Sequence, residues 1–121
     1  MTTITATVSD PSGLETSRDS TIQADAQAAA EIWASHLLGS GSIQVQVVIT
    51  NQLPLPEIAE GGSLVASYTG TSGGIAHYDL GAASEVKIGT DPNGSDPDII
   101  VYLSSQEINN GDLFLDPSPT Q

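Results

Sequence analysis

The sequence predicts a single α+β domain over residues 1–121, in which one Ala-rich amphipathic helix packs on a twisted mixed β-sheet. Two observations predict the sheet: residues 3–8 alternate with a period of two, and residues 43–50 and 99–103 are rich in β-branched side chains. A third observation, apolar residues at helical spacing over 22–37, predicts the helix. At 121 residues the chain has room for one core.

The first strand is expected at residues 3–8, where Thr alternates with apolar side chains, and the turn-forming segment 10–13 ends it. In the helix that follows, Ser20 or Thr21 is the expected N-cap, and Gly39 with Gly41 is expected to end it. Trp33 is expected to be among the most buried residues. The apolar stripe that we expect to face the core consists of Ile22, Ala26, Ala29, Trp33 and Leu37.

The second half of the chain is predicted to be mainly β. After the strand at 43–50, a Pro-containing segment interrupts the chain, and glycines separate short strand-like pieces at 64–68, 75–78 and 86–88. Residues 91–98 form a turn-rich loop, and 99–103 is the apolar run typical of a central strand.

Fifteen acidic residues face only Arg18 and Lys87, which gives a net charge of −13. Two cations cannot build a basic patch, so binding to nucleic acid or to an anionic membrane surface is not expected. This acidic composition suits an extracellular protein in salty or calcium-rich surroundings, although residues 1–10 have no signal-peptide pattern and an intracellular protein stays an alternative. The chain has no cysteine, which removes disulfides and thiol chemistry.

No catalytic, cofactor-binding or zinc-binding residue is predicted in this chain. A catalytic zinc site needs three protein ligands, commonly including two His one helical turn apart. The chain has only His36 and His77, 41 positions apart, with no H-E-x-x-H pattern. His36 is interpreted as a helix C-terminal residue that interacts with the dipole, and His77 as a half-exposed strand or loop residue.

Calcium is the more suitable cation, because Asp91, Asn93, Asp96 and Asp98 place oxygen ligands close together in one loop. Their spacing differs from the helix–loop–helix calcium motif, and Tyr102 occupies the place of its bidentate Glu. The alternative, which the sequence favours, is an Asp/Asn/Pro turn chosen for its backbone preferences. Added calcium or salt is expected to stabilise such an acidic chain.

Four segments carry a resemblance to a known family. They are AQAAAEIW at 26–33, IQVQVVIT at 43–50, DIIVYL at 98–103 and GDLFLDPSP at 111–119. In this order they resemble the start of a metzincin-like secreted bacterial zinc metalloprotease domain, over about residues 1–119. The resemblance implies a zinc metallopeptidase that acts on peptide or protein substrates, in which the last segment runs into the helix bearing H-E-x-x-H.

That helix, the third zinc ligand and the Met-turn of the family have no counterpart in these residues. The resemblance therefore implies an incomplete domain, truncated before its zinc-binding half and inactive alone, with zinc needed only by the full domain. The apolar residues 113–115 fit this expectation, because they should pack against a further element. The alternative is a non-enzymatic, β-rich extracellular module, either adhesin-like or stabilised by calcium.

Overall fold

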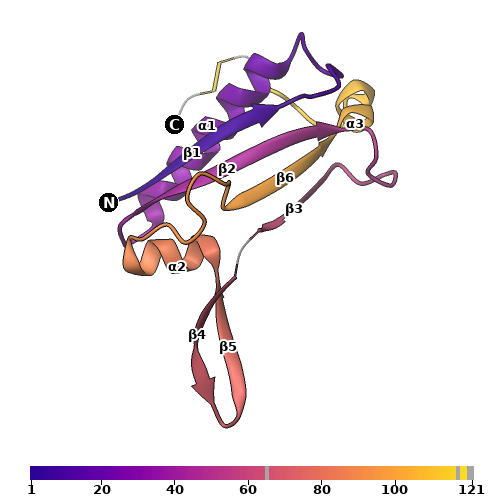
Figure 1. Ribbon diagram of the computed structural model, residues 1–121. Helices are drawn as coiled ribbons and strands as arrows, with labels where there is room; N and C mark the ends of the chain where they lie inside the picture. Colours follow the sequence, from indigo (N-terminus) through magenta and orange to yellow (C-terminus); the bar gives the residue numbers. More distant parts are fainter. Residues whose placement is uncertain (65, 117, 120–121) are drawn as a thin grey trace.

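The computed structural model describes residues 1–64, 66–116 and 118–119, and it has the α+β architecture that the sequence predicts (Figure 1). Its elements are β1 (Thr2–Ser9), α1 (Asp19–His36), β2 (Gly41–Thr50), β3 (Ala59–Ser63), β4 (Ala66–Ser72), β5 (Ile75–Leu80), α2 (Gly81–Ile88), β6 (Ile99–Ser104) and α3 (Ser105–Asn110). The strands expected at 3–8, 43–50 and 99–103 are β1, β2 and β6.

The main sheet is mixed and has the strand order β1-β2-β6-β3. β1, β2 and β6 run parallel, whereas β3 runs antiparallel to β6 and forms one edge. Gly61 and Gly62 lie inside β3, because β6 supplies backbone partners that override the low strand propensity of Gly. β6 therefore lies between β2 and β3.

The two faces of the sheet differ in polarity, as the alternation in β1 predicts. Thr3, Thr5 and Thr7 are exposed on one face, whereas Ala6 is buried on the face that α1 covers. The core on the α1 face is formed by Ile22, Val47, Ile49 and Ile108, with Val8, Leu14, Ala26, Val101, Leu103, Leu113 and Leu115 packed against it.

Trp33 is not buried: 67% of its surface is exposed, which corrects the sequence expectation. The buried residues of α1 are Ile22 and Ala30, so the contact face of its second half is centred on Ala30. Trp33 then lies at the rim of the interface between α1 and the sheet. The helix also begins one residue before Ser20, after Arg18, and no side chain caps it.

Two glutamines of α1 form hydrogen bonds with the outer backbone groups of β1. Gln23 accepts a hydrogen bond from the Val8 N–H at 2.8 Å and donates one to the Ala6 carbonyl. Gln27 accepts from the Ala6 N–H at 2.9 Å and donates to the Ile4 carbonyl at 3.3 Å. One helical turn separates the two amides, so together they take the place of a further strand and close this edge of the sheet.

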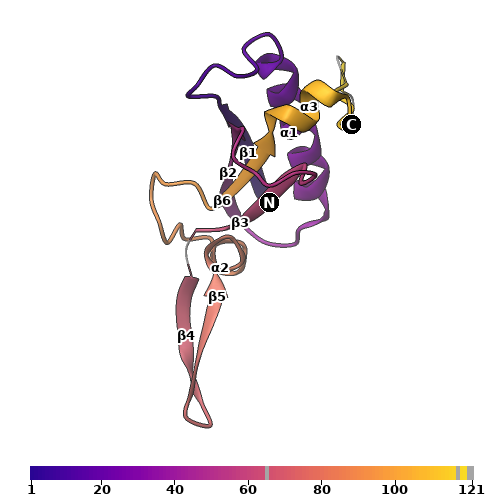
Figure 2. The same cartoon turned by 90° about the vertical axis from the view of Figure 1, so that its right-hand side faces the viewer.

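The segment between β3 and β6 leaves the sheet as an arm and returns as a helix. β4 and β5 form a hairpin that projects from the rest of the molecule (Figures 1 and 2). Within it, the rings of Tyr68 and Tyr78 pack edge-on at 5.6 Å between centroids. The strand expected at 86–88 is wrong, because these residues end α2. Gly89 adopts the αL conformation and ends that helix, and its N–H donates a hydrogen bond to the Glu85 carbonyl.

Gly39 and Gly41 have a different role from the helix C-terminal one that we expected. α1 ends without them, because its C-cap Leu37 is already extended. A Cβ atom on Gly39 would lie 2.4 Å from the Val86 carbonyl oxygen, and one on Gly41 would lie 2.9 Å from the Glu85 Cγ. The absence of side chains at these two positions therefore lets α2 approach the start of β2.

α3 was not expected from the sequence. It follows β6 directly, and the Ser104 side chain caps it by accepting a hydrogen bond from the Glu107 N–H at 3.3 Å. After it, Leu113 and Leu115 pack on the core, whereas Phe114 is 82% exposed. Residues 113–115 thus find part of their packing within this chain.

Candidate functional site

The outer edge of β3 presents backbone groups away from the sheet. The Ile58 carbonyl accepts from the Ser104 N–H at 2.8 Å, and the Leu64 N–H donates to the Asp98 carbonyl at 3.2 Å. Because alternate residues of an antiparallel edge strand bond the neighbouring strand, the N–H and C=O groups of Ala59 and Gly61 point outward. Such groups can pair with another extended chain.

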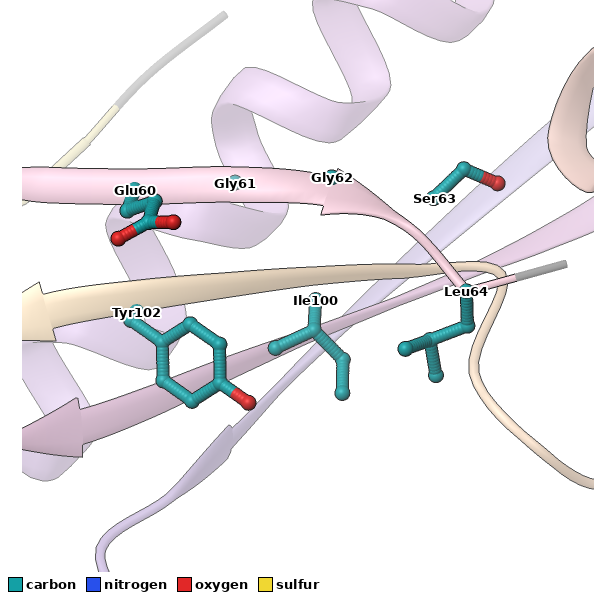
Figure 3. Close-up of a pocket in the computed structure, with 7 residues that line it drawn as sticks. All are labelled: Glu60, Gly61, Gly62, Ser63, Leu64, Ile100 and Tyr102. Atoms are coloured by element: carbon teal, nitrogen blue, oxygen red, sulfur yellow. The ribbon is translucent and has the colours of Figure 1, made fainter.

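Beside this edge lies a shallow hollow of about 180 Å³ on the sheet face opposite α1 (Figure 3). Tyr102, Ile100 and Leu64 line it with apolar surface, and Glu60 adds a carboxylate on the same side. A Cβ atom on Gly62 would meet no atom within 4 Å, so packing within the described chain does not require glycine there. Because Gly61 and Gly62 have no side chains, the backbone of another chain can approach β3 closely.

On the opposite face, an apolar groove of about 400 Å³ separates α1 from the β6 side of the sheet. Its walls are Ala29, Ala30 and Trp33 of α1 and Val45, Ile99 and Val101 of the sheet, among other apolar residues. A second hollow continues from the shared residues Ala26, Val47 and Val101 to Phe114. α1 thus covers the β1 side of this face and leaves an apolar strip beside β6.

The two histidines lie on separate elements. His36 is exposed at the end of α1, where its Nδ1 lies 2.8 Å from the Ile32 carbonyl oxygen. His77 is exposed on β5, in the projecting hairpin, opposite Gly70. Neither belongs to the group of three metal-ligating side chains that the described residues bring together.

That group consists of Glu85, Asp91 and Asp98, whose ligand oxygens all lie within 4.8 Å of one another. Glu85 and Asp98 are buried, with 2% and 1% of their surface exposed. Of the loop residues that the sequence singled out, Asp91 and Asp98 are brought together, whereas Asp96 is exposed and lies outside the group. Glu85 was missed, because it comes from α2, a helix that the sequence analysis did not identify.

Backbone N–H groups hold all three carboxylates in place. Ser42 N–H donates to Glu85 Oε1 at 2.5 Å, and Gln44 N–H donates to Asp98 Oδ2 at 2.7 Å, so both anchors lie on β2. Asp91 Oδ1 accepts from the N–H groups of Asn93 and Gly94 at 2.9 and 2.8 Å, which fixes the turn. The pKa of Glu85 is raised, first by burial and then by the charges of Asp98 and Asp91 and by its side-chain proximity to Asp98, while the hydrogen bond from the Ser42 N–H opposes this rise.

No protein-family model matches the chain, and no curated protein or solved structure matches it either. Among the described residues, no helix is both long and apolar enough to cross a membrane. The β3 edge, the apolar groove and the carboxylate group are the features of this chain that bear on its function.

Proposed function

We propose that this chain is the N-terminal, sheet-bearing part of a secreted metzincin-like zinc metalloprotease domain and is catalytically inactive by itself. The observation that carries the proposal is the open β6–β3 side of the sheet. One face there has an apolar groove, and the adjoining edge offers backbone groups for pairing. Both features suit a protease, because an apolar groove can seat a further element and an open strand edge can pair with an extended peptide.

The sequence resemblance supports the same proposal through element order. Its four segments fall on the second half of α1, on β2, on β6 and on the residues that follow α3. In the proposed domain, a peptide substrate pairs with the outward groups of Ala59 and Gly61, and its side chains contact the hollow around Tyr102. This arrangement involves neither nucleic acid nor a membrane.

In the proposed enzyme, the zinc site is not built from residues 1–121. Zinc hydrolysis requires several ligands on a rigid frame and a base beside the metal-bound water. His36 and His77 come from the end of a helix and from a projecting hairpin, and neither belongs to a group of three or more possible metal ligands among the described residues. In this proposal the metal ligands and the base belong to chain that follows residue 121.

Activity measurements test the proposal directly. The purified 121-residue chain should not cleave casein or a peptide library, whereas a protein extended by its downstream coding sequence should show chelator-sensitive cleavage. In the extended protein, Gly61→Pro removes an outward N–H without removing a β6 bond, so KM should rise several-fold with little change in kcat. Chelator-sensitive cleavage by the short chain, or a stop codon with no H-E-x-x-H sequence in the downstream frame, would contradict the proposal.

One observation favours the alternative, a non-enzymatic extracellular module stabilised by calcium. The three carboxylates at Glu85, Asp91 and Asp98 are a feature that such a module would share. The downstream reading frame and the cleavage assay separate the two functions, because only the protease requires a catalytic continuation.

A further inference from the structure

We propose that Glu85, Asp91 and Asp98 form a structural calcium site that fastens α2 and the 91–98 loop to the start of β2. The inference does not depend on the proposed protease function, because it concerns only residues of this chain. It is carried by three independent features: unpartnered buried oxygens, uncompensated charge, and the way in which the backbone positions the carboxylates.

The buried oxygens are the first feature. Glu85 Oε2 and Asp98 Oδ1 are both inaccessible to solvent, and with both carboxylates ionised no described residue donates a hydrogen bond to either. Both side chains are more than nine-tenths buried, and their ligand atoms converge with that of Asp91. A buried carboxylate oxygen without a partner is costly, and a bound cation removes that cost.

Charge is the second feature. The chain has two basic side chains, and both are paired elsewhere: Lys87 Nζ lies 2.6 Å from Asp79 Oδ2, and Arg18 lies 2.8 Å from Glu15 Oε2. Three neighbouring carboxylates therefore have no lysine or arginine to balance them. Carboxylates that share a site must either take up protons or bind a cation.

The third feature is how the carboxylates are held. Each is fixed through one oxygen by backbone N–H groups: Glu85 by Ser42, Asp98 by Gln44, and Asp91 by its own turn. For Glu85 and Asp98 the second oxygen remains available for a ligand. Asn93 Oδ1, in the same turn as Asp91, is also buried without a partner and is a candidate fourth oxygen.

The ligand chemistry selects calcium. All the donors are oxygens, which hard cations prefer, whereas protein zinc sites are built mainly from His and Cys. Calcium binds oxygen at roughly 2.3–2.6 Å, so one ion can bridge oxygens about 5 Å apart, and the group lies within 4.8 Å. Magnesium needs a tighter octahedral shell and retains its waters, which a buried cluster of anchored carboxylates does not favour.

The site joins parts of the chain that are distant in sequence. Glu85 is on α2, which follows the β4–β5 hairpin, and Asp98 immediately precedes β6 (Figures 1 and 2). Both are anchored on β2, and Gly39 and Gly41 allow α2 to approach it closely. Calcium would therefore hold the base of the projecting hairpin against the sheet.

The test uses the 121-residue chain after treatment with a chelator. Calcium at about 100-fold above its Kd should raise Tm by roughly 10 °C, more than magnesium or sodium chloride at matched ionic strength. Calorimetric titration should give about one calcium per chain, with a Kd on the order of 10⁻⁴ M, as in extracellular calcium modules.

Three amide variants locate the site. Glu85→Gln and Asp98→Asn keep the oxygen that accepts the backbone N–H but remove a charge, so both should weaken calcium binding by about tenfold or more. Asp96→Asn is the matched control, because it makes the same charge change at an exposed position of the same loop and should leave calcium binding unchanged.

The calcium-free variants separate a lost site from a damaged fold. Without calcium, Glu85→Gln and Asp98→Asn should melt at a higher temperature than the original chain, because each removes one of three mutually repelling charges. Equal stabilisation by calcium and by matched sodium chloride would overturn the proposal. Calcium binding that is undiminished in both variants, or a proton shared by Glu85 and Asp98 with no calcium uptake, would overturn it as well.

Discussion

Individual carboxylates in this chain lie where burial and like charges oppose their ionisation, and Asp19 is an example outside the proposed calcium site. It begins α1, and its Oδ1 is buried without a hydrogen-bond partner among the described residues. Burial raises the pKa of Asp19, and the neighbouring Asp10 and Glu15 raise it further. The favourable position at a helix N-terminus does not compensate for these effects.

The raised pKa of Asp19 predicts a pH-dependent stability. A carboxyl whose pKa is higher in the folded than in the unfolded state destabilises the fold when it is ionised. Asp19→Asn should therefore increase the free energy of unfolding at pH 7, and the gain should shrink as pH falls through the folded-state pKa. Below the unfolded value of about 3.9 it should vanish.

Urea unfolding of both proteins at several pH values measures this difference. Asp96→Asn serves as the control, because Asp96 is exposed and its substitution should show no comparable gain at pH 7. A gain that persists unchanged at low pH would contradict the assignment to ionisation of Asp19.

At the scale of elements, the two edge strands of the sheet differ in whether their outer backbone groups form hydrogen bonds. On β1, the amides of Gln23 and Gln27 occupy the outer backbone groups, so this edge is closed by the chain's own helix. On β3, the outer groups of Ala59 and Gly61 face away from the sheet. The asymmetry supports the proposal that a peptide pairs with β3, because open edges pair readily with other strands.

The glutamine pair on α1 predicts a cost when it is removed. Gln27→Ala leaves the Ala6 N–H without its acceptor in a buried part of β1, and it also removes the donor to the Ile4 carbonyl. We expect a loss of about 1–3 kcal/mol in the free energy of unfolding. The double variant with Gln23→Ala should, in addition, self-associate through the exposed edge.

Gln106→Ala provides the control for this prediction. Gln106 is an exposed glutamine on α3, so the same substitution should change stability by less than about 0.5 kcal/mol. Denaturation and sedimentation measurements check both results. Equal, small losses in Gln27→Ala and Gln106→Ala would show that the edge bonds contribute little.

At the scale of the whole molecule, the sheet is only partly covered. α1 packs mainly over β1, while the strip along β6 stays an open apolar groove with Trp33 at its rim. Large apolar surface that is open to solvent marks interaction sites in stable proteins. In the proposed protease, the chain that follows residue 121 covers this groove.

Trp33 reports on whether the groove is covered. In the 121-residue chain, Trp33→Ala should lower the free energy of unfolding by less than about 1 kcal/mol, because the ring is two-thirds exposed. In the extended protein the same substitution should cost roughly 3–5 kcal/mol, as for a buried aromatic ring. Small losses in both proteins would show that the groove stays open.

Trp33 also shows why the sequence predicts part of this structure and not the rest. Its spacing from Ile22 and Ala26 matches a helical stripe, and the helix is present. The stripe alone does not say which part of it meets the sheet, since that depends on how α1 lies over β1 and β2. The sequence does not predict α2 and α3, because each is shorter than two and a half turns and too short to show a helical period. For α3, the spacing of Ser104 and Glu107 matches a helix N-cap and could have indicated where the helix begins.

The sequence by itself determined the α+β class, the long helix, the strands at 3–8, 43–50 and 99–103 and the acidic balance, because these follow from local periodicity and composition. Only the tertiary structure decided that Asp91 and Asp98 meet Glu85 while Asp96 stays outside, since Glu85 reaches them through α2 and the close approach at Gly39 and Gly41. The tertiary structure also decided which sheet edge has its backbone groups bonded, because Gln27 and Gln23 lie 21 and 15 residues along the chain from the β1 residues that they contact. Contacts between distant segments depend on the path of the chain in space, and local sequence patterns do not determine that path.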